Sequence, residues 1–117
     1  MARIVFLLTR SPRVGQHADT VYRIANAALK KSHNVDVVFL GDAVYALIKS
    51  QASFTGSLSI GDKFRELQLK GARLFAGDYS VEGAGLSGKT DMMLEVSLVD
   101  WADISDSLAG AEVVLSF

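Results

Sequence analysis

The sequence contains no cysteine, and this absence removes several classes of chemistry. Without a thiolate, the chain forms no disulfide and provides no cysteine ligands for an iron–sulfur cluster or a zinc ion. It also has no thiol nucleophile and no place to hold a cysteine persulfide. Chemistry that passes through a cysteine thiol of this chain is therefore excluded.

The sequence also has no large excess of positive or negative charge and no long hydrophobic run. The net charge is −1 and basic residues are scattered among acidic ones, so we expect no nucleic acid or anionic lipid as a partner. No apolar run approaches the ~18 residues that a membrane span needs. Residues 1–3 lead into an apolar segment without a signal-peptide pattern. We therefore expect no membrane association and a cytoplasmic location.

Apolar residues, in contrast, are abundant. Half of the 117 residues are hydrophobic and 21% are charged. This composition suits one globular domain over residues 1–117, large enough to bury its own core. It is apolar for a small monomer, which favours assembly into an oligomer.

The first forty residues predict a strand, a helix and a second strand. Residues 4–8 and 35–40 are short, mostly apolar runs rich in β-branched and aromatic side chains. Between Asp19 and Leu29, apolar residues recur at the spacing of one helix face. A connection of this length returns the chain for parallel pairing, so the unit is a right-handed βαβ motif.

The remaining chain continues the alternation of strands and helices. We expect short helices and strands whose approximate positions are 43–48 (helix), 60–70 (helix), 73–76 (strand), 94–98 (strand), 100–109 (helix, capped by Asp100) and 113–115 (strand). Loops are expected over residues 51–59 and 81–90, the latter with about one helical turn. The pattern predicts an α/β three-layer sandwich of about five mostly parallel strands with helices on both faces, a flavodoxin-like layout.

Ligands of such sheets bind beyond the carboxyl ends of the strands, near the point where strand order reverses. Three loops reach this edge, at residues 9–16, 41–45 and 77–85. The candidate pocket consists of Thr9, Arg10, Ser11, Gly41, Asp42, Ala76, Gly77 and Asp78.

The polar members of this pocket allow two interpretations. Arg10 and its neighbouring hydroxyls suit an anion, whereas Asp42 and Asp78 suit proton transfer if they converge. His17 adds a possible general acid or base. The alternative is structural, with solvated or interface arginines, aspartates in turns and a histidine at a helix start.

Several segments together resemble the DsrE/DsrF-like (YchN-like) family of sulfur-relay proteins. The resemblance is carried by the apolar first strand and its Thr-Arg-Ser-Pro loop, the segments 17–29 and 32–44, the Lys-Gly-Ala-Arg-Leu-Phe-Ala-Gly run at 70–77, and the ending at 109–117. It covers nearly the whole chain, and it rests on apolar runs and small residues more than on a chemical signature.

The resemblance implies a small α/β subunit that forms dimers, trimers or hexamers, either with itself or with related chains. Active members pass sulfane sulfur between cysteine persulfides, and their carrier cysteine follows the third strand. Ala76 stands at the matching place, followed by Gly77 and Asp78. Because a methyl group cannot ionise or hold a persulfide, we expect a non-catalytic or regulatory member of an intracellular sulfur relay, without a cofactor.

One further motif points to nucleotide binding. Residues 83–90 satisfy the phosphate-loop pattern through Gly83, Gly88, Lys89 and Thr90. A true phosphate loop follows a buried strand directly and opens a helix, but the residues just before Gly83 are too polar for a core strand. We therefore favour a glycine-rich loop over a nucleotide site.

A metal site is not expected. The two histidines, His17 and His33, lie at opposite ends of the predicted first helix, which separates them too far to ligate one ion within a subunit.

Overall fold

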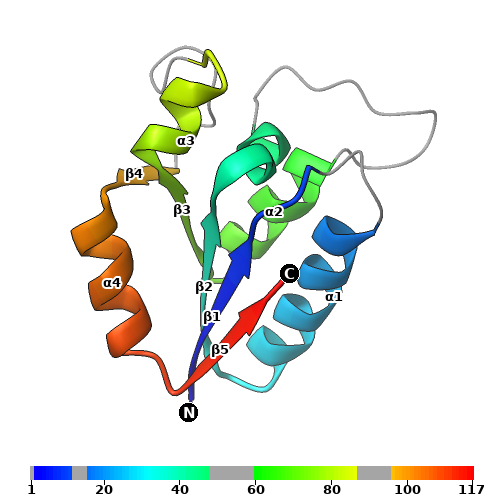
Figure 1. The fold of residues 1–117 in the computed structure, drawn as a ribbon. Coiled ribbons are helices and arrows are strands. Elements are labelled where there is room, and N and C mark those ends of the chain that lie inside the picture. Colours follow the sequence, from blue (N-terminus) through cyan, green and yellow to red (C-terminus); the bar gives the residue numbers. More distant parts are fainter. Residues whose placement is uncertain (1, 12–15, 48–59, 87–95) are drawn as a thin grey trace, which may run out of the picture.

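The computed structural model describes residues 2–11, 16–47, 60–86 and 96–117. Five strands form one sheet in the order β4-β3-β2-β1-β5, and every neighbouring pair is parallel (Figure 1). The strands are β1 (Arg3–Leu8), β2 (Asn34–Phe39), β3 (Arg73–Gly77), β4 (Ser97–Val99) and β5 (Val113–Ser116). The expected sheet is confirmed, and its strands are all parallel rather than mostly so.

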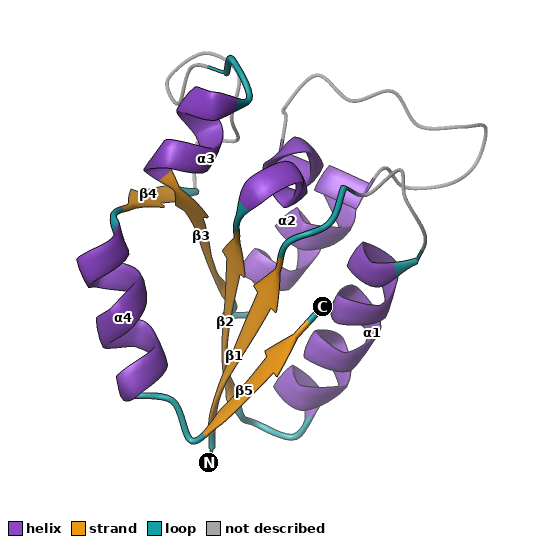
Figure 2. Cartoon of the chain, in the orientation of Figure 1, coloured by secondary structure: helices purple, strands orange, loops and turns teal. Residues whose placement is uncertain are grey.

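The connections contain four α-helices and one 3₁₀ helix in the described residues (Figure 2). They are α1 (His17–Lys30), the 3₁₀ helix η1 (Gly41–Leu47), α2 (Ile60–Leu69), α3 (Asp78–Gly83) and α4 (Trp101–Ala109). None of these helices is both long and apolar enough to cross a membrane.

The order of the strands decides which face each helix covers. From β1 to β4, each strand is added beside the previous one, so right-handed crossovers keep their connections on one face of the sheet. The chain then returns past β1 to form β5, and the same handedness puts α4 on the opposite face (Figure 2). The three expected layers are present, and in the described ranges one outer layer contains a single helix.

The larger core lies between the sheet and the helices α1 and α2. Phe39 of β2 and Phe64 of α2 are fully buried and meet edge to face, with ring centroids 4.9 Å apart. The opposite face has a smaller core, in which Ile104 of α4 packs on Val5 and Val38. The helix α4 therefore covers the centre of its face.

Two expectations for the second half of the chain need correction. A loop was expected to follow the third strand with a helical turn from Val81, but α3 begins at Asp78, because Val81 and the strand end pack into the larger core. The fourth strand was expected near residues 94–98, and β4 spans Ser97–Val99. The expected loop at 51–59 and residues 94 and 95 lie outside the described residues.

The last helix begins as expected. Asp100 caps it, with the N–H of Asp103 donating to Oδ1 of Asp100 at 2.9 Å, and the side chain of Asp103 accepts the N–H of Asp100 in return. Trp101, the first residue of this helix, is 60% exposed in this chain.

The sheet contains an ion cluster around a buried aspartate, which neither composition nor periodicity indicates. Asp36 of β2 is 1% exposed and lies between Arg3 of β1 and Arg73 of β3. Arg73 donates from Nε and Nη2 to the two carboxylate oxygens at 2.7 and 2.8 Å, and Arg3 donates from Nη2 at 3.2 Å. Burial raises the pKa of Asp36, and the charge of Arg3 opposes this effect.

We predict that Arg73→Ala destabilises the protein more than Asp36→Val does. Loss of Arg73 leaves a buried carboxylate with one weaker partner, which costs about 3 kcal/mol of unfolding free energy. Asp36→Val removes the buried charge and leaves two arginines that water reaches, so the loss should stay below about 1 kcal/mol. Urea unfolding measures both, and equal losses would contradict the prediction. Arg23→Ala, which removes an exposed ion pair with Asp19, is the control.

Polar contacts also join α1 to α2. Nζ of Lys63 lies 3.0 Å from Oδ1 of Asp19, and the hydroxyl of Tyr22 donates to Glu66 at 3.1 Å. The hydrogen bond from Lys63 lowers the pKa of Asp19. The pKa of Glu66 is lowered by hydrogen bonds from Lys70 and then from Tyr22. Both carboxyl groups therefore favour the folded state when they are ionised.

This linkage predicts a pH dependence. The stabilisation is complete above the pKa values of the unfolded chain, about 4, and is lost as the pH falls through the lower pKa values of the folded state. The Asp19→Asn/Glu66→Gln variant should therefore unfold at lower urea than the wild type at about pH 7, and the gap should close near about pH 2. Glu82→Gln is the control. If the difference in urea midpoint between the wild type and the double variant were the same at both pH values, ionised Asp19 and Glu66 would not be the source of the stabilisation.

Candidate functional site

The carboxyl ends of β1, β2 and β3 lie side by side, as the prediction of a strand-end site requires. The structure distributes the candidate residues over this edge in two groups. The side chains in reach of solvent are Thr9, Arg10, Ser11, Asp42 and Asp78. Gly41 is exposed as well, but Ala76 and Gly77 are buried.

The reversal of strand order lies at β3 and β4. The connection that leaves β3 enters α3 on one face of the sheet, whereas the one that leaves β4 enters α4 on the other (Figure 1). Loops diverge at such a point, which is where ligands of open α/β sheets bind. Of the three expected loops, only the one that begins at Gly77 reaches it. The other side of this point is formed by Asp100 and Trp101, which no local sequence pattern marks as site residues.

Short contacts hold the edge together around Gly41 and Gly77. The N–H of Gly41 donates to Oγ of Ser80 at 2.8 Å, which ties the end of β2 to α3. Gly41 has a φ of +56°, a conformation that favours glycine. A Cβ atom at Gly77 would lie 2.8 Å from Cδ2 of Leu40, so the Leu40 side chain packs directly against Gly77. The contact through Ser80 was not predicted, because no spacing in the sequence indicates it.

The expected ionisable groups fall into separate contacts, and in the described residues neither Asp42 nor Asp78 contacts Arg10 or His17. Arg10 Nη1 lies 3.4 Å from Nε2 of His17, while Asp78 accepts the N–H of the next residue, Tyr79, at 2.7 Å. Asp42 lies in the first turn of η1. Within the described ranges, no hydrogen bond or ion pair joins either aspartate to Arg10 or His17, and no three acidic or histidine side chains form a metal-binding group. These contacts provide no catalytic acid–base pair.

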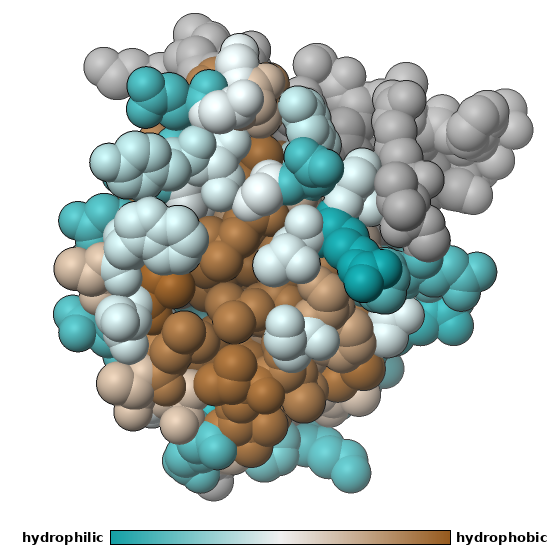
Figure 3. Space-filling view, viewed as in Figure 1, coloured by the Kyte–Doolittle hydropathy of each residue, from teal (hydrophilic) through white to brown (hydrophobic). Residues whose placement is uncertain are grey.

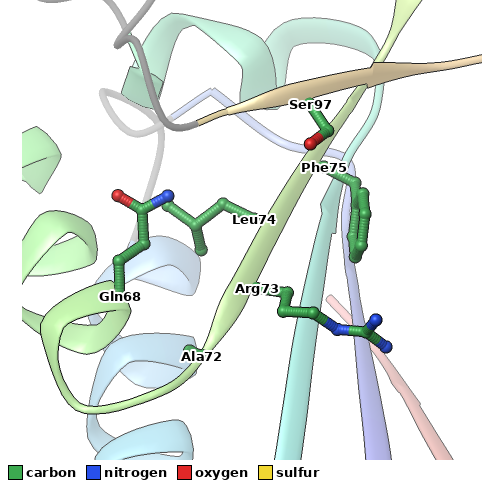
Figure 4. Close-up of a pocket in the computed structure, with 6 residues that line it drawn as sticks. All are labelled: Gln68, Ala72, Arg73, Leu74, Phe75 and Ser97. Carbon is green, nitrogen blue, oxygen red and sulfur yellow. The ribbon is translucent and has the colours of Figure 1, made fainter.

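A cavity of about 470 Å³ lies elsewhere, along the part of β3 that β4 does not cover (Figure 4). Arg73 and Phe75 point to one side of β3, and Leu74 points to the other with Gln68 (Figure 4). Its lining is Gln68, Ala72, Arg73, Leu74, Phe75 and Ser97. Arg73 is its one ionisable side chain and already binds Asp36, so this lining supplies no acid, base or nucleophile.

The phosphate-loop pattern lacks the strand that it needs in front of it. Gly83 is the last residue of α3, and a turn follows at Ala84 and Gly85. Gly88, Lys89 and Thr90 lie outside the described residues. A phosphate loop needs a buried strand directly before it, so that its backbone N–H groups wrap around the phosphates. Here the helix α3 precedes the motif instead.

Comparison with known proteins identifies the family. The model of the DsrE/DsrF-like family matches residues 2–117. The chain belongs to the DsrE/DsrF-like family. Its fold matches a solved structure of the YchN protein from E. coli over 100% of both chains, with a TM-score of 0.89 and 19% identity.

A second structure of the same fold is MTH1491 from Methanobacterium thermoautotrophicum, a protein described as of unknown function. It also matches over 100% of both chains, with a TM-score of 0.78 and 17% identity. A comparison with curated proteins found no match.

Within this DsrE/DsrF-like fold, the position expected to match the carrier cysteine is closed to solvent. Ala76 is 0% exposed and packs in the larger core, and Gly77 is also buried. Asp78 is the first exposed side chain after β3. A reactive group would therefore meet solvent at position 78 rather than at position 76.

Single cysteines introduced at these positions should report this difference. We expect Asp78→Cys to react with iodoacetamide at least about tenfold faster than Ala76→Cys in the folded protein, because thiol reactivity requires access. Intact-mass spectrometry follows the reaction. In urea the two variants should react alike, which controls for the reagent. Rapid reaction of Ala76→Cys in the folded protein would show that β3 ends differently in solution.

Proposed function

We propose that the chain is a cytoplasmic, non-catalytic or regulatory subunit of a sulfur relay. It assembles with copies of itself or with related cysteine-bearing subunits, as a dimer, trimer or hexamer. In this role the chain carries no persulfide. It changes the rate at which a cysteine-bearing partner transfers sulfur.

The observation that carries this proposal is the buried Ala76 at the end of β3 in a chain without cysteine. Family membership supports the connection to sulfur relay, and the missing thiol removes the transfer step from this chain. The strand-end edge supports the same conclusion, because its contacts join η1 to α3 and Arg10 to His17 without assembling a catalytic pair.

The experiment is co-expression with a cysteine-bearing DsrE/DsrF-like protein from the same genome. Native mass spectrometry should detect a mixed complex, and the partner's rate of accepting sulfur from a persulfide donor should differ between the complex and the partner alone. The chain by itself should gain no sulfur that a reductant removes. Free partner and chain in separate peaks, with an unchanged transfer rate, would contradict the proposal.

A second candidate is the binding of a small anion at the strand ends. It rests on Arg10, which lies beside His17 at the start of α1 and next to the exposed Thr9. Thermal unfolding with and without inorganic phosphate tests it. A rise in melting temperature that Arg10→Ala abolishes would favour this candidate, and no rise would remove it.

A further inference from the structure

The sheet face under α4 is incompletely covered. The helices α1 and α2 both lie on the other face, so among the described helices α4 is the one that shields this face, and it packs on the centre of the face. At the β5 side Val114 is 43% exposed, and on α4 itself Trp101 is 60% exposed. Figure 3 shows hydrophobic side chains as a continuous area between α4 and α1. A soluble protein seldom leaves such an area in water.

Cations lie on this same face. The strand register aligns Arg73, Asp36, Val5 and Val114 in one row across four strands, and Arg3 lies two residues before Val5 on the same face. Two guanidinium groups thus share one carboxylate, and their side chains remain 39% and 55% exposed. With Asp36 ionised, the three side chains carry a net charge of +1, and in the described residues Asp36 is the one carboxylate that forms an ion pair with Arg3 or Arg73.

Anions lie on the helix beside it. The segment of α4 contains Asp103 and Asp106 and no basic residue, and both aspartates are exposed. Carboxylates three residues apart repel each other, and Asp106 lies in the half of the helix where the dipole disfavours negative charge. An opposing cation would relieve both costs, and no ion pair with Asp106 occurs in the described part of this chain.

We propose that the α4 face is the surface through which two copies of this chain associate. The outer side of α4 of one copy, with Trp101, packs on the uncovered sheet around Val114 of the other, and its aspartates face the cations Arg3 and Arg73. Apolar area and opposite charges are adjacent on one surface, so the surface is complementary to a copy of itself. This interface would be the one through which copies of the chain assemble, so the inference rests on the proposed function.

The test is sedimentation velocity of the purified full chain across a concentration series. The wild type should be an oligomer, and Trp101→Ala should raise the dissociation constant at least about tenfold, as loss of a buried aromatic anchor does. Asp106→Lys should do the same while keeping the helix, because a cation suits that end of it. High salt should weaken the wild-type association.

Matched controls are Tyr79→Ala, which removes another exposed aromatic, and Glu82→Lys, which reverses a charge on α3. Both should leave the dissociation constant unchanged, and circular dichroism should show all variants folded.

An oligomeric wild type whose mass survives Trp101→Ala and Asp106→Lys would overturn this surface and leave the proposed function intact. A monomeric wild type at high micromolar concentration would overturn association between copies. In that case a mixed complex with a cysteine-bearing relative would still support the sulfur-relay role, which is read separately from the partner's transfer rate.

Discussion

The architecture depends on one constraint, the right-handedness of parallel crossovers. Because β1 to β4 are added in sequence toward one edge, their connections share one face, and only the return to β5 crosses the other. The unequal number of connections on the two faces puts the large core on the side of α1 and α2, and α4 is the one helix that the structure describes on the opposite face (Figure 2). It also makes the loops after β3 and β4 diverge, which defines the candidate ligand edge.

The thinly covered face explains why a charge sits inside the sheet. On a face with two covering helices, Asp36 would lie far from water and would cost several kcal/mol even when paired. Here Arg3 and Arg73 reach it from the neighbouring strands and still extend to solvent. The cluster is therefore tolerated where the covering layer is thin, and it places charged side chains on this face.

The chemistry of the chain is limited by the same arrangement of layers. Ala76 belongs to the large core because its side chain faces α1 and α2, so the end of β3 is closed on that side. Polar groups at the edge are occupied in local contacts, as shown by Gly41 with Ser80 and by Arg10 with His17. The chain retains the fold of the DsrE/DsrF-like family without a cysteine thiol.

The sequence by itself determined the alternation of strands and helices, the capping of α4 by Asp100 and the exclusion of thiol chemistry, because periodicity, caps and composition are local properties. Tertiary structure decided the rest. Asp36 looked like any polar strand residue until register put arginines on both sides of it. Trp101 begins the one described helix on its face of the sheet, and the strand order, which no local pattern shows, decides that this helix lies there and leaves Trp101 60% exposed.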